Sequence, residues 1–162
     1  MIHEVHGDIL LSRAQVIAHG VAPNDDFHHG LALSLRERWP AMYKDFRHFC
    51  HTKGPKPGET WSWAGAGGRV VALLTQEAPE HNHAHPGKAN HHNVNAALKA
   101  LAAQVREEDV RSVALPRLAT GVGGMDWTEV REMLNRQLGD LDADIYVYTQ
   151  YQPGVQAVEP GL

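Results

Sequence analysis

Short apolar stretches with the spacing of strands alternate along this chain with longer amphipathic stretches that have the spacing of helices. Leu98, Leu101 and Val105 recur on one helical face, whereas residues 112–115 form a short apolar run. Strands that alternate with helices pair in parallel, and the helices cover both faces of the sheet. The sequence therefore predicts an α/β fold. The predicted strands are residues 2–5, 15–21, 61–63, 69–75, 112–115 and 145–148, and the predicted helices are residues 31–39, 42–49, 94–105 and 127–138.

Ligands of such folds bind beyond the carboxyl ends of the parallel strands. Three loops leave those ends in the predicted arrangement, namely residues 7–9, 19–30 and 118–124. We therefore expect the functional site among these loops.

Length and charge narrow the functional classes. The chain has 162 residues, which is close to one domain, and its formal net charge is −4 with neutral histidines. A protein that holds duplex DNA through a basic face needs the opposite sign, so no tight non-specific duplex binding is expected. A bound phosphate is more easily held by backbone amides. The lone Cys50 excludes an intramolecular disulfide and a zinc site built from several cysteines.

Nothing in the sequence predicts a membrane segment or a signal peptide. The N-terminal residues lack a basic segment followed by an apolar run, and the apolar stretches are far shorter than the roughly 20 residues of a membrane helix. We expect a cytoplasmic protein without membrane contact. Residues 1–151 are expected to form one domain, and residues 152–162 a frayed C-terminal tail.

The first chemical motif is the glycine-rich segment Ala119-Thr120-Gly121-Val122-Gly123-Gly124. It lies between a predicted strand and a helix whose start, Asp126-Trp127-Thr128-Glu129, has the form of an N-terminal cap. Glycines allow backbone amides to approach a phosphate, and a helix N-terminus adds partial positive charge. A tight turn without a ligand explains the glycines equally well. The segment lacks the Gly-Lys-Ser/Thr ending of a P-loop, which disfavours a nucleotide triphosphatase.

Two further segments lie at strand ends. Asp8, in the turn Gly7-Asp8-Ile9, is either a turn residue or an acceptor for the amino group of a base. Residues 24–32 read Asn-Asp-Asp-Phe-His-His-Gly-Leu-Ala. They form either a solvated loop that caps the next helix or a second phosphate-binding loop.

Together these motifs resemble the macrodomain family. The resemblance spans residues 2–150 and rests on Gly-Asp-Ile after the first strand, on Ile-Ala-His-Gly in the second, on the Gly-Leu-Ala helix start and above all on residues 116–127. It is greatest to the branch that contains the terminal ADP-ribose glycohydrolases and the antitoxin macrodomains that remove ADP-ribose from DNA. The resemblance implies a three-layer α/β/α fold with a central mixed, twisted sheet.

The resemblance also implies an ADP-ribose pocket. Asp8 would contact the adenine amino group beside Ile9, and Tyr148 would form either a wall at the adenosine end or part of the core. The diphosphate would lie between two sets of backbone amides, and Gly123→Glu is expected to place a carboxylate against it. The two sets are Gly30, Leu31 and Ala32, and Thr120, Gly121, Val122, Gly123 and Gly124.

The chain departs from the catalytic patterns of the family. In the hydrolase branch a lysine that acts on the opened ribose follows the strand that ends here at Thr75, and this chain has Gln76, which we expect only to line the ligand. Some members carry an acidic residue where this chain has Gly123, and another hydrolase class has an aspartate where it has Ala32.

Other groups near the distal ribose are candidates for catalysis. A carboxylate or imidazole beside the anomeric carbon can position or activate water. We predict Asn24, Asp25, Asp26 and His29 as catalytic, with His19 beside the ligand. His28 and Lys88 lie on the same and the adjoining loop. Each of these residues is equally compatible with a solvated or capping role.

The sequence thus predicts a binder of ADP-ribose, or of a macromolecule (DNA or protein) that carries it. The polar loop at residues 24–29 favours a hydrolase, and Gln76 favours a reader without turnover. No cofactor is predicted, and no metal either, although His81, His83, His85, His91 and His92 have ligating side chains. Trp61 and Trp63 point to one side of a strand, for packing or for stacking on a base.

Overall fold

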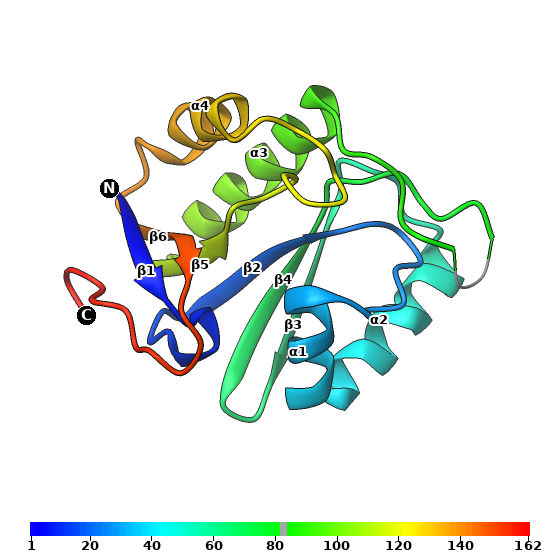
Figure 1. Cartoon of the computed structure of the whole chain (residues 1–162), viewed down its shortest axis with the longest axis horizontal. Helices are drawn as coiled ribbons and strands as arrows, with labels where there is room; N and C mark the ends of the chain where they lie inside the picture. Colours follow the sequence, from blue (N-terminus) through cyan, green and yellow to red (C-terminus); the bar gives the residue numbers. More distant parts are fainter. Residues whose placement is uncertain (82–83) are drawn as a thin grey trace.

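The computed structural model describes residues 1–81 and 84–162, and its helices and strands follow the predicted alternation (Figure 1). The strands are β1 (Ile2–Gly7), β2 (Val16–Val21), β3 (Thr60–Gly65), β4 (Gly68–Leu74), β5 (Ser112–Pro116) and β6 (Asp144–Tyr151). The helices are the 3-10 turn η1 (Ile9–Leu11), α1 (Gly30–Arg38), α2 (Pro40–Lys53), α3 (His91–Glu107) and α4 (Trp127–Leu138).

The strands of the described residues form one six-stranded sheet in the order β1-β6-β5-β2-β4-β3. The pairs β1–β6, β6–β5, β5–β2 and β2–β4 are parallel, whereas β3 and β4 form an antiparallel hairpin. The predicted mixed sheet is therefore confirmed. Because β1, β2, β4, β5 and β6 run in one direction, their carboxyl ends meet at one edge of the sheet.

Two apolar cores cover the two faces of the sheet. In β5 the side chains of Val113 and Leu115 pack under α3 and α4, whereas Ala114 points to the core under α1 and α2. This alternation follows from the two-residue repeat of a strand. The two pairs of helices lie on opposite faces of the sheet in Figure 1. The α/β/α layers that the resemblance implied are confirmed.

The helices begin and end near the predicted positions. α1 ends before Trp39, and Pro40 occupies the first turn of α2, where a missing amide costs little. Asp126 is the N-cap residue of α4, but its side chain accepts no cap hydrogen bond. Among residues 1–81 and 84–162 no helix is long and apolar enough to cross a membrane.

The expectation of a frayed C-terminal tail is wrong. Residues 152–162, the C-terminal segment, fold back over β1 and η1. Glu159 is buried and accepts hydrogen bonds from the Ser12 hydroxyl (2.6 Å), the Arg13 amide (2.9 Å) and the Tyr148 hydroxyl (2.9 Å). A Cβ on Gly7, whose φ is +155°, would lie 2.8 Å from the Ala157 nitrogen, so the close approach requires a glycine.

Candidate functional site

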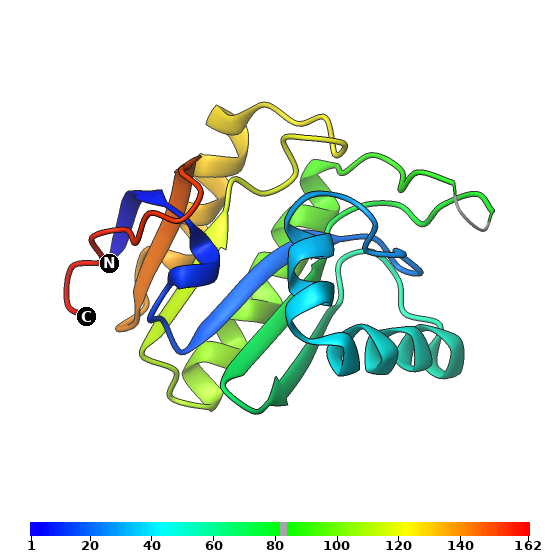
Figure 2. The ribbon, with the colours of Figure 1, turned by 60° about the horizontal axis from the view of Figure 1, so that its bottom comes forward.

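The loops after β2, β4 and β5 gather at the carboxyl edge of the sheet. Figure 2 shows the yellow loop after β5 beside the green loop after β4. The Ala89 amide of the green loop donates to the Gly123 carbonyl of the yellow one (3.0 Å). This edge holds two adjoining hollows of about 350 and 310 Å³, which share Gly30, Leu31 and Pro116. We call the two together the loop cleft.

The larger hollow forms the first end of the loop cleft. Asp8 lines it and is only 8% exposed, and its carboxylate accepts from the amides of Leu10 (3.0 Å) and Gly154 (3.0 Å). A carboxylate has about four acceptor positions, so Asp8 retains capacity for a donor from a ligand. Ile9 and Tyr151 complete the apolar wall. This end suits a flat, partly apolar group that carries an amino group.

Tyr148 belongs both to the wall and to the core. It lines the first end of the cleft, yet it is 5% exposed and its hydroxyl donates to Glu159. Burial, assisted by the neighbouring carboxylates of Glu159 and Asp8, raises the pKa of Tyr148 well above its ordinary value. The phenol therefore stays neutral, and the C-terminal segment holds the ring in place.

Backbone groups form the middle of the loop cleft. On one side the first amides of α1, those of Gly30, Leu31 and Ala32, have no partner within the helix, because α1 begins there. Gly30 has a φ of +59°, which a glycine adopts without strain. On the other side lie Gly121, Val122 and Gly123. Such a pair of backbone walls suits an anion such as a diphosphate.

The glycine loop is closed by its own hydrogen bonds. The Met125 amide donates to the Ala119 carbonyl (2.9 Å), and the Gly124 amide donates to the Gly121 carbonyl (3.0 Å). A Cβ on Gly123 would lie 2.7 Å from the Ala119 oxygen, whereas a Cβ on Gly121 would meet nothing within 4 Å. The expectation for Gly123→Glu was therefore wrong in its reason: the side chain would break the turn. Gly121 also lines the cleft, and a side chain there would meet no neighbouring atom.

Two members of the predicted diphosphate set do not line the loop cleft. The Thr120 hydroxyl donates to the Arg117 carbonyl (3.2 Å) within its own turn. Gly124 faces Lys88 instead, and a Cβ built on it would lie 4.0 Å from the Lys88 Cδ. Leu118 and Ala119 contribute to the wall in their place. A glycine-rich sequence does not show which of its residues face inward.

The far end of the loop cleft is lined by polar groups. Gln76 is 8% exposed, and its side-chain amide donates to the Gly87 carbonyl (3.0 Å). The residue after β4 thus ties down the β4–α3 loop (residues 75–90) and also lines the cleft. His85 of this loop lies opposite His29, with ring centroids 5.7 Å apart. The contribution of His85 was not foreseen, because the path of a long loop leaves no mark in sequence spacing.

Asp25 and Asp26 also lie at the far end. The Asp25 carboxylate accepts from the amides of Phe27 (2.9 Å) and Ala22 (3.3 Å), and burial raises its pKa. Asp26 accepts from the His28 amide (3.2 Å), with the His28 Nε2 at 3.9 Å. Both aspartates line the cleft while they stabilise the β2–α1 loop (residues 22–29). A structural role in the loop and a role at the cleft are therefore compatible for both aspartates.

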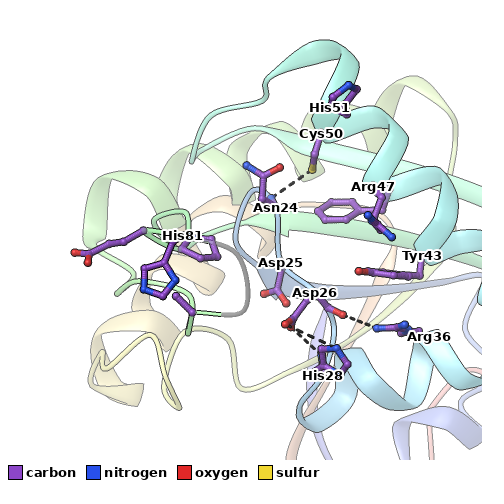
Figure 3. A pocket seen from close by; sticks show the side chains of 14 residues that line it. Asn24, Asp25, Asp26, His28, Arg36, Tyr43, Arg47, Cys50, His51 and His81 are labelled. Atoms are coloured by element: carbon purple, nitrogen blue, oxygen red, sulfur yellow. Dashed lines mark hydrogen bonds and ion pairs between the residues drawn. The ribbon is translucent and has the colours of Figure 1, made fainter.

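Asn24 is not brought into the loop cleft. It has a φ of 60°, and its amide donates to the Cys50 Sγ (3.4 Å), which turns the residue toward α2. Asn24 lines a separate hollow (Figure 3). Asn24 shares that hollow with Asp25 and Asp26 but does not line the loop cleft with His29, and its catalytic role stays a prediction. Burial raises the pKa of the Cys50 thiol, so this cysteine is not an activated nucleophile.

His19 forms part of the floor of the loop cleft. It is 2% exposed, its ring meets Phe27 edge-on, and its Nε2 has no hydrogen-bond partner among the described residues. Burial lowers the pKa of His19 from 6.5 to about 4. The ring is neutral at pH 7, with a nitrogen available to a ligand.

The remaining candidates are resolved in part. Trp61 stacks on Phe49, and Trp63 donates to Asp45, so both tryptophans serve packing around α2. Within residues 1–81 and 84–162 no three His, Cys, Asp or Glu side chains gather as metal ligands do. His83, one member of the histidine cluster, lies outside the described residues.

Comparison with known proteins identifies the fold. The model of the Macro domain family matches residues 27–134. The chain is 27% identical over 168 residues to the DNA ADP-ribosyl glycohydrolase of Mycobacterium tuberculosis, and this covers 98% of the chain and 46% of that protein. The chain is 25% identical to the Thermus aquaticus protein of the same name, and this covers 99% of the chain and 44% of that protein. The chain therefore spans about half the length of these relatives.

Solved structures agree with this result. The macrodomain of Mycobacterium tuberculosis DarG superposes with a TM-score of 0.80 at 24% identity, covering 95% of this chain and 99% of that one. The structure of Thermosipho africanus DarTG in complex with ADP-ribose superposes with a TM-score of 0.79 at 18% identity, covering 96% of this chain and 42% of that one. Because the family model matches more than half of its residues, the chain belongs to the macro domain family.

Proposed function

We propose that this protein binds ADP-ribose and hydrolyses the bond that joins ADP-ribose to DNA. The loop cleft carries the proposal: its two adjoining hollows offer an acceptor at one end, backbone amides in the middle and titratable side chains at the other. Relatives that match nearly the whole chain are named DNA ADP-ribosyl glycohydrolases, and a structural neighbour is a complex with ADP-ribose.

The chemistry of ADP-ribose matches this order of groups. The adenine lies against Ile9 and Tyr148, with its amino group donating to Asp8. The diphosphate lies between the start of α1 and Gly121 to Gly123. Backbone amides and a helix N-terminus stabilise the anion without any basic side chain, which fits a chain of net charge −4.

The distal ribose then lies at the end that Asp26 and His29 line. Hydrolysis adds the oxygen of water to the anomeric carbon and breaks its bond to the base. The electron pair of that bond stays with the base, which gains a proton. His29 or Asp26 accepts the proton from the attacking water. Asp25 acts as a positioning residue, because its carboxylate accepts from two amides of the loop that carries them.

A reader without turnover is the second candidate, and Gln76 favours it. An amide cannot form a Schiff base or act as a general acid, and this one is buried and bonded to the Gly87 carbonyl. Such a protein would bind ADP-ribose in the same cleft and release nothing.

One assay separates the two candidates. The protein is incubated with mono-ADP-ribosylated DNA, and free ADP-ribose is followed by chromatography. The proposal expects release by the wild type and its loss in His29→Ala or Asp26→Asn, with binding of free ADP-ribose retained. Binding by the wild type without release supports the reader. Thr52→Ala, on the exposed side of α2 and outside the loop cleft, is the control variant.

A further inference from the structure

A second hollow adjoins the loop cleft and has no part in the proposal above. It has a volume of about 640 Å³ and lies between the β2–α1 loop and α2 (Figure 3). Asp25 and Asp26 line both this hollow and the far end of the loop cleft. The two spaces are therefore neighbours across one short loop. We call this hollow the α2 groove.

Two arginines are held in place in the α2 groove. The Arg36 guanidinium lies 4.1 Å from the centre of the Tyr43 ring and donates to the Asp26 carbonyl (2.8 Å). The Arg47 guanidinium lies 5.9 Å from the same ring. In Figure 3 the Tyr43 side chain lies between the two groups. Cation–π contacts restrain both side chains, so less entropy is lost when they bind an anion.

The positive charge continues along the exposed face of α2. The pairs 44/47, 44/48, 47/51 and 48/51 are three or four residues apart, so Lys44, Arg47, His48 and His51 share one helical face, and they line a shallow hollow of about 300 Å³. Arg47 and His51 belong to the α2 groove as well. Lys44 and Arg47 therefore make this face positive, whereas the chain as a whole has a net charge of −4 with neutral histidines.

Carboxylates are also present in the α2 groove. Asp25 accepts from two amides of its own loop, Asp26 is directed to the His28 amide and ring, and Glu80 lies across the groove on the β4–α3 loop. Among the described residues none of these carboxylates forms an ion pair with Arg36 or Arg47, and Asp26 meets Arg36 through its backbone carbonyl instead. The guanidinium groups are thus left for an anion from outside.

We propose that the α2 groove binds the sugar–phosphate backbone of the DNA strand next to the ADP-ribosylated nucleotide. This inference rests on the proposed function. An acceptor attached to the distal ribose must leave the loop cleft at its far end, and Asp25 and Asp26 mark the border to the α2 groove. Guanidinium forks match phosphate oxygens, and a row of cations follows a single strand. A single strand fits because a duplex keeps its bases stacked out of reach of the cleft.

The test compares ligands that carry ADP-ribose with and without an attached DNA strand. Affinities are measured by calorimetry for free ADP-ribose, for an ADP-ribosylated nucleoside and for an ADP-ribosylated single-stranded oligonucleotide, using a variant without turnover. The proposal expects the oligonucleotide to bind more tightly than the nucleoside. Arg47→Glu should reduce that gain roughly ten-fold, because it reverses a charge beside the phosphates. Binding of free ADP-ribose should not change.

Arg106→Glu is the matched control, since Arg106 is an exposed arginine on α3, on the other face of the sheet. The salt dependence gives a second readout: the slope of log K against log salt should fall by about 0.7 for each lost phosphate contact. The strand proposal is overturned if the oligonucleotide gains nothing over the nucleoside, or if both variants lose equally. It is also overturned if an ADP-ribosylated peptide gains as much. In those cases ADP-ribose still binds, whereas failure of the proposed function shows as no binding of ADP-ribose, or as no release of ADP-ribose from modified DNA by the wild type.

Discussion

The most direct test of the loop cleft is a charge placed at Gly121. A Cβ at this position meets nothing within 4 Å, and the residue lines the cleft opposite the start of α1. We therefore expect Gly121→Glu to add a carboxylate beside the proposed diphosphate without breaking the turn. Gly123→Ala, by contrast, places its Cβ 2.7 Å from the Ala119 oxygen and should destabilise the fold.

The size of the effect follows from Coulomb's law. Two unit charges about 5 Å apart repel by roughly 3 kcal/mol at an effective dielectric constant of about 20. A diphosphate carries about two charges, and we halve the sum of about 6 kcal/mol for screening at an exposed loop. The remaining repulsion of about 3 kcal/mol weakens ADP-ribose binding roughly 100-fold.

The assay is titration calorimetry with ADP-ribose, together with thermal unfolding to establish that each variant is folded. Gly121→Gln has almost the same shape without the charge and should bind nearly as the wild type does. In 1 M salt, where the Debye length is about 3 Å, Gly121→Glu should recover part of its affinity. Unchanged binding by Gly121→Glu, or an equal loss in Gly121→Gln, would show that the diphosphate does not lie there.

Three further predictions concern stability. Glu159→Ala leaves the donors of Ser12, Arg13 and Tyr148 without their acceptor and should cost about 2–4 kcal/mol in urea unfolding; a loss below about 1 kcal/mol would contradict the packing of the C-terminal segment. The pKa of His19 is lowered from 6.5 to about 4 in the fold, so the unfolded chain binds its proton first as the pH falls. Stability present above pH 6.5 should therefore decline by up to about 3 kcal/mol toward pH 4, and His19→Gln should flatten that part of the curve. Gln76→Ala removes the bond to the Gly87 carbonyl and should cost about 1 kcal/mol, with faster proteolysis in the β4–α3 loop as the diagnostic readout.

Features that depend on local periodicity could be predicted from the sequence. The apolar run of β5 and the apolar stripe of α3 each indicate which residues are buried. The layers of helices and sheet could therefore be predicted from these patterns. The position of the glycine loop followed as well, since glycines mark the turn between β5 and α4. What those glycines face depends on hydrogen bonds such as that from Met125 to Ala119, which no pattern encodes.

Features that depend on distant partners could not be predicted. Glu159 is held by Ser12, Arg13 and Tyr148, and the polar, Pro- and Gly-containing residues around it resemble a loose tail when they are read alone. The side-chain type of Asn24 and its position in a polar loop suggested a catalytic role. Its backbone, at φ 60°, directs it to the other side of the loop. Side-chain identity defined the candidate residues, and backbone conformation decided which of them meet.

The pairing of β1 with β6 also has a consequence for how the protein is made. Ile2 lies opposite Ile145, so β1 waits for a partner strand that is synthesised about 140 residues later. At roughly 5–20 residues per second this interval lasts about 7–30 s. Asp8 is synthesised before this interval and Tyr148 after it, and both line the same end of the cleft. The nascent chain can thus form the β2–β4 half of the sheet early, but the end of the cleft proposed for adenine is complete only after β6 has been synthesised.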